Sequence, residues 1–126
     1  MAADYREISQ EYAQGGIKAA LLINGGAAVA LLSQAAELAH AGIADSATSA
    51  MIVWAFGVFA AAGAWLVAFM STRYVDKSER EENKTEAHLK TADIFMNVGL
   101  GLIAASLICF LVGSISIAYG FGKIAE

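Results

Sequence analysis

The chain has 126 residues, of which 58% are hydrophobic and 16% charged, with a net charge of −4. A soluble domain carries roughly 25% charged residues, so this composition lacks the polar cover that a water-exposed surface needs. The length allows one domain. Because basic residues alternate with acidic ones and form no patch, we expect no nucleic acid as a partner.

Three long stretches contain no Asp, Glu, Lys or Arg. They comprise 18, 27 and 29 residues, at positions 19–36, 46–72 and 94–122. A helix needs about 20 mostly apolar residues to cross a hydrocarbon core of roughly 30 Å. A soluble helical bundle would instead show charges every three or four residues on its outer faces. The pattern predicts an all-α integral membrane protein with three transmembrane helices, forming one domain over residues 1–126.

The N-terminal residues 1–16 are predicted to form a short amphipathic segment on the cytoplasmic surface. Tyr5, Ile8 and Tyr12 follow one another at spacings of three and four, which places them on one face of a helix. We expect Gly15 and Gly16 to let the chain turn from this segment into the bilayer. The alternative for these residues is a frayed tail.

The remaining chain divides into spans and connections. A polar loop is expected at 40–49, on the outer side. The charged stretch between the second and third spans is predicted to be a helical hairpin that turns near residues 83–85, supported by opposite charges four residues apart. The predicted boundaries are 17–37 for the first span, 50–72 for the second, 73–93 for the hairpin and 94–119 for the third.

Orientation follows from lysine and arginine, which favour the cytoplasmic side of a membrane. Three spans place the N-terminus and the hairpin on one side, and that side holds seven of the eight basic residues. We therefore expect a cytoplasmic N-terminus and a C-terminus outside, where only Lys123 is basic. The predicted cytoplasmic docking element of the hairpin comprises Arg73, Lys77, Arg80 and Lys84.

Polar groups inside the predicted spans are few, and none of them is ionisable. Asn24 lies about seven residues into the first span and Asn97 about four into the third. Because their predicted depths are similar, we expect an intramembrane polar layer in which the two amides share hydrogen bonds, within one chain or between chains. The functional alternative is that Asn24 lines a pore or binds a lipid headgroup.

Small residues recur at helix-packing spacing along all three spans. In lipid, helices associate by close van der Waals fit, which small side chains allow. Three helices leave some of these faces uncovered, which predicts a homo-oligomer; the alternative is that all the seams are intramolecular. The predicted packing residues are Gly25, Gly26, Gly57, Ala61, Ala64 and Gly101.

Residues with catalytic or metal-binding potential are scattered. His40 and His88 fall on opposite sides of the predicted membrane, and the single Cys109 lies within the third apolar run. We therefore predict no cofactor, no metal site and no enzymatic activity. The three-span plan resembles that of bacterial diacylglycerol kinase, but residues 51–72 lack the acidic group on the second span that such a kinase needs.

The first span carries a second resemblance. Residues 18–32 read KAALLINGGAAVALL, which is similar to the first span of uncharacterised small bacterial inner-membrane proteins. The resemblance implies a bacterial plasma membrane and no known activity. We hypothesise a non-enzymatic protein that self-associates, as a small pore or a membrane-perturbing effector, with membrane lipids around it. The alternatives are an accessory subunit of a larger membrane complex and an enzyme acting on lipids.

Overall fold

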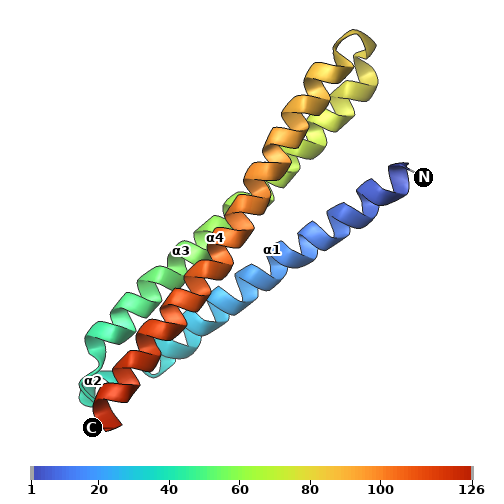
Figure 1. Ribbon diagram of the computed structural model, residues 1–126. Helices are drawn as coiled ribbons and strands as arrows, with labels where there is room; N and C mark the ends of the chain where they lie inside the picture. Colours follow the sequence, from blue (N-terminus) through green and yellow to red (C-terminus); the bar gives the residue numbers. More distant parts are fainter. Residues whose placement is uncertain (1, 126) are drawn as a thin grey trace.

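The computed structural model describes residues 2–125, with side chains described from residue 7 onward. Figure 1 shows α3 and α4 running antiparallel and side by side, while α1 packs beside them and diverges toward its N-terminus. The C-terminus and the short α2 lie at the end opposite the α3–α4 turn. In chain order the elements are α1 (Ala2–Ser33), α2 (Ala35–His40), α3 (Ala44–Arg80), a 3-10 turn (Glu82–Lys84) and α4 (Thr85–Ala125).

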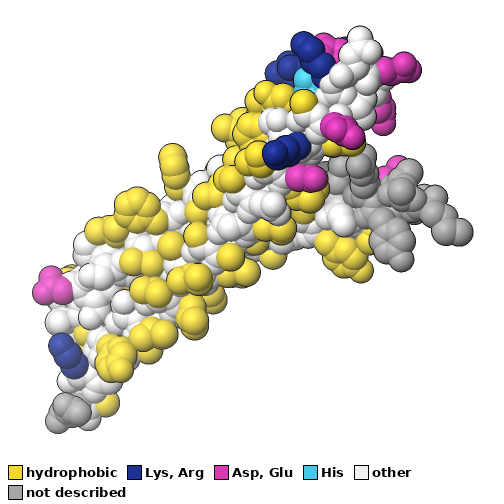
Figure 2. Space-filling model, turned by 45° about the horizontal axis from the view of Figure 1, so that its top comes forward, with side chains coloured by type: hydrophobic (Ala, Val, Ile, Leu, Met, Phe, Trp, Pro, Cys, Tyr) yellow, Lys and Arg dark blue, Asp and Glu magenta, His cyan; other side chains and the backbone are white. Residues whose placement is uncertain are grey.

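Three of these helices, α1, α3 and α4, are long and apolar enough to cross a membrane, which indicates a membrane location. At about 1.5 Å per residue, the 37 residues of α3 and 41 of α4 extend about 56 and 62 Å. A hydrocarbon core measures roughly 30 Å, so the α3–α4 pair must project beyond it. Figure 2 shows hydrophobic side chains over the middle of the molecule and most charged side chains near the hairpin tip.

The N-terminal segment differs from the prediction because α1 is a single helix through Gly15 and Gly16. Relative to alanine, a glycine in a helix interior lowers stability by only about 1 kcal/mol. The helical residues on either side of the two glycines therefore keep the backbone helical there. The expected turn at these glycines is therefore wrong. Of the three residues predicted to share a face, Ile8 and Tyr12 are exposed; the side chain of Tyr5 lies outside the described residues.

The link between α1 and α3 comprises residues 34–43, and most of it forms α2, since α1 ends at Ser33 and α3 begins at Ala44. Gly42 follows α2 with a φ of 82°, and its N–H donates to the Ala39 carbonyl. The N–H of Ile43 donates to the Leu38 carbonyl, and these two side chains pack together. This pair of bonds with its apolar contact is a Schellman motif, which reverses the chain within a few residues.

The seam between α3 and α4 consists of small residues that repeat every seven positions. A strict repeat of seven keeps one face toward the partner helix, as in a left-handed coiled coil, and small side chains let the two backbones approach closely. The buried residues at this repeat are Ala92, Gly99, Ser106, Gly113 and Gly120 on α4, and Ala50, Gly57, Ala64, Ser71 and Ser78 on α3.

Three hydroxyl groups fix the register of this seam by donating to carbonyls of the opposite helix. Ser106 Oγ donates to the Gly57 carbonyl at 2.7 Å. Ser71 Oγ donates to the Ala92 carbonyl at 2.9 Å, and the Thr85 hydroxyl is shared between the Ser78 carbonyl and the Glu82 carbonyl of the turn, both at 3.1 Å. A hydrogen bond between membrane helices is worth only about 0.6 kcal/mol, so the bonds of Ser106 and Ser71 specify alignment more than they add stability.

The seam predicts opposite effects for two glycine-to-alanine substitutions on α4. The indole of Trp54 donates to the Phe110 carbonyl at 3.1 Å and occupies the space that a side chain at Gly113 would need. Gly113→Ala should therefore destabilise the fold by about 1–3 kcal/mol through overpacking. Gly101→Ala has open space around it and should stabilise by up to about 1 kcal/mol.

Helicity of the detergent-purified variants, followed while SDS is titrated, measures both changes. Equal shifts of the two unfolding midpoints would contradict the assignment of the seam to the Gly113 face.

Candidate functional site

A buried polar layer joins all three long helices at Asn24. The side chain of Asn24 is 0% exposed, and its amide nitrogen lies 3.1 Å from both the carbonyl and the hydroxyl oxygen of Ser106. It also lies 3.0 Å from the Ala20 carbonyl of its own helix. Because Ser106 donates in turn to Gly57, the layer connects α1 with α4 and α4 with α3.

Gly57 makes this layer possible by leaving room for the amide. A Cβ at position 57 would overlap the Asn24 side chain, whose Oδ1 is the buried polar atom that has no hydrogen-bond partner within the described part of the chain. The Asn24 side chain therefore occupies the space that a side chain at position 57 would need. With Asn24 and Ser106 both fully buried, the layer is closed to solvent.

Asn97 does not join this layer within one chain. It is exposed on α4, nine residues before Ser106, which corresponds to about 13.5 Å along the axis and half a turn around it. The two asparagines therefore differ in depth and face, because the register of α1 places Asn24 level with Ser106. The expected intrachain pairing is corrected to Asn24 with Ser106; a bond between chains stays a prediction.

The predicted packing residues divide into two groups. Gly57, Ala61 and Ala64 are buried in α3. A Cβ at Gly25 would meet Val58 at 3.8 Å, whereas Gly26 and Gly101 have nothing within 4 Å.

The contacting face of α4 is thus not the one that contains Gly101. It is the face marked by the seven-residue spacing that includes Gly99, two positions earlier. That spacing is visible in the sequence, but small residues also recur at Gly101 and Ala105, so the spacing alone does not show which of the two faces meets α3. Packing of Gly26 and Gly101 against another chain stays a prediction.

The predicted docking residues Arg73, Lys77, Arg80 and Lys84 are all exposed. Arg80 forms an ion pair with Asp76 at 2.7 Å, the (i, i+4) partner that the sequence indicates. The Lys77 ammonium lies 5.0 Å from the centre of the Tyr74 ring, within the range of a cation–π contact.

His88 has a structural role that the sequence did not reveal. Its Nε2 lies 3.0 Å from Glu81 Oε2, its ring centre is 6.0 Å from that of Tyr74, and Tyr74 in turn stacks on Phe95 at 5.5 Å. The His88 hydrogen bond, aided by the nearby charges of Lys84 and Lys77, holds the pKa of Glu81 below its ordinary value of 4.5 despite partial desolvation. Residues of α4 are thereby tied to α3 and to the turn.

The hairpin contact predicts a pH response whose sign follows from the lowered pKa of Glu81. A depressed folded-state pKa means that the contact stabilises the hairpin above pH 4.5 and that this stabilisation is lost as the pH falls through the folded-state value. Spin labels at Glu79→Cys and Glu86→Cys, in a Cys109→Ala background, should therefore become more mobile as the pH is lowered from 7 to 3.

His88→Phe keeps a ring beside Tyr74 but removes the hydrogen bond, so it should flatten that pH response. An unchanged response in His88→Phe would contradict the role of His88.

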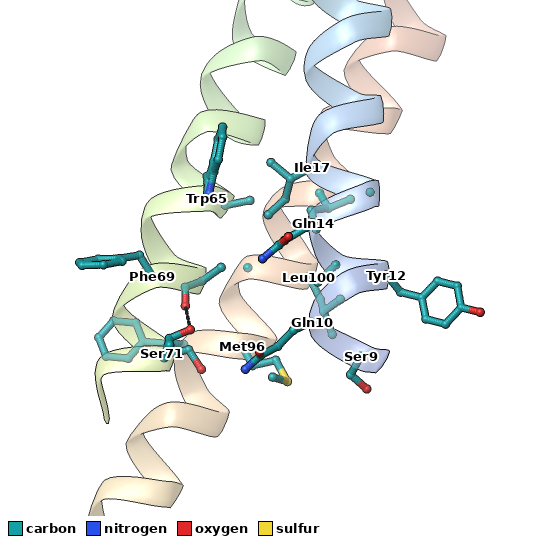
Figure 3. Close-up of a pocket in the computed structure, with 18 residues that line it drawn as sticks. Ser9, Gln10, Tyr12, Gln14, Ile17, Trp65, Phe69, Ser71, Met96 and Leu100 are labelled. Carbon is teal, nitrogen blue, oxygen red and sulfur yellow. Dashed lines mark hydrogen bonds between the residues drawn. The ribbon is translucent and has the colours of Figure 1, made fainter. Parts of the chain in front are cut away.

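A lateral groove of about 520 Å³ separates the N-terminal half of α1 from the α3–α4 pair. Figure 3 shows Gln10, Gln14 and Ile17 directed from α1 toward α3 and α4, while Tyr12 points away. The groove exists because α1 diverges from the hairpin toward its N-terminus. Its opposite wall is largely apolar and includes Trp65, Phe69, Met96, Leu100 and Ile103.

The polar layer predicts energetic coupling between Asn24 and Ser106 but not between Asn24 and Asn97. A double-mutant cycle with Asn24→Leu and Ser106→Ala should give a coupling energy of about 0.6–1.7 kcal/mol, the range for hydrogen bonds between membrane helices. The matched cycle with Asn24→Leu and Asn97→Leu should give a value near zero in dilute, monomeric samples. SDS titration measures both; the reverse ranking would disprove the layer as described.

No family model matches the sequence, and comparison with curated proteins and with solved structures found no match. Within residues 7–125, no three His, Cys, Asp or Glu side chains are grouped so that they could hold a metal ion. Function is therefore inferred from four features of the chain. These are the closed polar layer, the uncovered small residues of α1 and α4, the charged hairpin and the lateral groove.

Proposed function

We propose that this chain is a non-enzymatic protein of a bacterial inner membrane that self-associates through the outward faces of α1 and α4. The distribution of lysine and arginine supports a cytoplasmic N-terminus and hairpin, with the C-terminus on the outer side. The resemblance of residues 18–32 to small bacterial inner-membrane proteins supports the choice of membrane.

The main support for self-association is the exposed face of α4 around Gly101. Gly101 has open space around it, Ala105 lies one turn further along the same face, and both are exposed. Asn97 lies one turn before Gly101 and is also exposed. Membrane helices associate through small residues four apart and through side-chain amides that bond across the contact, and this face offers both.

A similar face on α1 extends the surface available to a second copy. Gly26 has nothing within 4 Å, and the neighbouring Leu22 and Val29 are 73% and 68% exposed. In our proposal these residues and the Asn97–Gly101 face meet the corresponding helices of other copies.

The closed polar layer bears on where a pore could form in such an assembly. Asn24 and Ser106 fill the space between α1, α3 and α4, so this layer has no solvent-filled passage within one chain. A pore would therefore form between copies. A membrane-perturbing effector needs the same association, and the exposed basic side chains of the hairpin would dock its cytoplasmic partner.

An accessory subunit of a larger membrane complex is the second candidate. It is favoured by the α3–α4 hairpin, which extends well beyond the length that a bilayer core requires. In that case the faces of α1 and α4 would contact another membrane protein.

Self-association predicts that Gly101→Leu and Asn97→Leu each weaken oligomers about tenfold, because a larger or apolar side chain removes the close fit or the hydrogen bond. Sedimentation of the detergent-purified chain over a range of protein-to-detergent ratios measures this dissociation. Ala55→Leu, an exposed substitution on α3, serves as the control and should have no effect. A chain that stays monomeric at every ratio would contradict the proposal, and co-purification with one other membrane protein would favour the accessory subunit.

A further inference from the structure

We infer that the lateral groove binds one phospholipid molecule, with its acyl chains against α3 and α4 and its headgroup at the end nearest Arg73. The inference goes beyond self-association, since the groove opens between α1 and the hairpin of a single chain. It assigns a specific lipid site to a protein otherwise surrounded by bulk lipid.

The wall formed by α3 and α4 matches hydrocarbon. Trp65 and Phe69 are more than half exposed on the α3 side, and Leu100 is 54% exposed on the α4 side. These side chains belong to the predicted second and third spans, so they face the acyl region of one leaflet. Apolar surface of this kind is stabilised by contact with acyl chains and not by water.

The wall formed by α1 is different because it carries amides. Gln10 and Gln14 project into the groove opposite the apolar wall. Each amide offers two N–H donors, which suit the ester carbonyl and phosphate oxygens of a phospholipid. Hydrocarbon alone would leave these donors unpaired, at a cost in free energy. A ligand that is apolar on one side and rich in acceptors on the other satisfies both walls.

The rim of the groove carries charges of both signs. Arg73 directly follows Thr72, the last residue of α3 that lines the groove, and therefore lies at that end of it. Glu7 precedes Gln10 by three residues and lies on the same face of α1; both charged residues are exposed. A guanidinium binds a phosphate group well, and a carboxylate pairs with a primary ammonium. This arrangement fits a zwitterionic headgroup such as phosphoethanolamine.

The polar groups of the groove favour a lipid over a helix from another protein. The groove is lined by residues within 9–17, 64–72 and 95–103, so each wall spans eight helical steps, or about 12 Å. Over that length one wall carries the amides of Gln10 and Gln14 and the opposite wall is largely apolar. A membrane helix that is apolar all round would leave these amides unpaired, whereas the oxygens of a phospholipid pair with them.

The test is native mass spectrometry of the full chain, released from detergent after equilibration with phosphatidylethanolamine. We expect one lipid retained per chain. Ala68→Phe fills the groove from α3 and should lower retention about tenfold, and Ala13→Phe should do the same from α1. Ala62→Phe is the matched control on α3, because residue 62 is exposed but lies outside the groove. Arg73→Gln should weaken retention, and phosphatidylglycerol, which lacks the amine, should bind less tightly.

Several results would overturn the inference. Equal retention by Ala13→Phe, Ala68→Phe and Ala62→Phe would show that bound lipid is not in the groove. A disulfide between Gln14→Cys and Leu100→Cys of different chains would show that a second copy occupies it. Sedimentation of the same variants separates this site from self-association: the groove variants should lose lipid without changing oligomeric state, and Gly101→Leu should do the reverse.

Discussion

The close approach of α3 and α4 is the constraint from which the remaining structure follows. Small residues at every seventh position bring the two backbones together, and Trp54 fits only because Gly113 has no side chain. Since the seam is made of small residues, the large apolar side chains have to point outward. An exterior of that kind is stable in lipid and not in water. The tight seam and the membrane location therefore depend on the same placement of small residues inside and large apolar residues outside.

The position of α1 depends on contacts at several levels. Ile17 is buried, Asn24 bonds to the seam, and Leu31 packs against the cluster of Leu38, Ile43 and Ala47. Asn24 enters a space that exists because residue 57 is glycine, and it bonds to the same Ser106 hydroxyl that aligns α3 with α4. On the N-terminal side of Asn24, α1 diverges from the hairpin (Figure 1). This divergence gives the chain the lateral groove in which we propose that lipid binds. The uncovered faces proposed to bind further copies, around Gly26 and Gly101, point outward from the packed part of the molecule.

The hairpin continues the same seam into a different environment. Ser78 and Thr85 keep the seven-residue register, but around them the contacts change to an ion pair, a histidine–carboxylate bond and stacked rings. Outside hydrocarbon, apolar contact with lipid no longer supports the two helices, and polar contacts between side chains maintain the pairing. This explains why His88, which reads as an ordinary surface histidine, is partly enclosed between Glu81 and Tyr74.

The amino-acid sequence was sufficient for the three long helices, because the absence of charge over 18 or more residues is a local property that lipid alone can satisfy. The sequence was insufficient to predict which face of each helix contacts the neighbouring helices. A span that is apolar all round has no polar face that could be excluded as the contact face. Gly99 and Gly101 are equally small, and only packing shows which one meets α3. The hydrogen-bond partner of Asn24 could not be predicted from the sequence either, because it depends on the axial offset between α1 and α4. That offset arises when Gly57, Ser106 and Asn24 fit together in three dimensions.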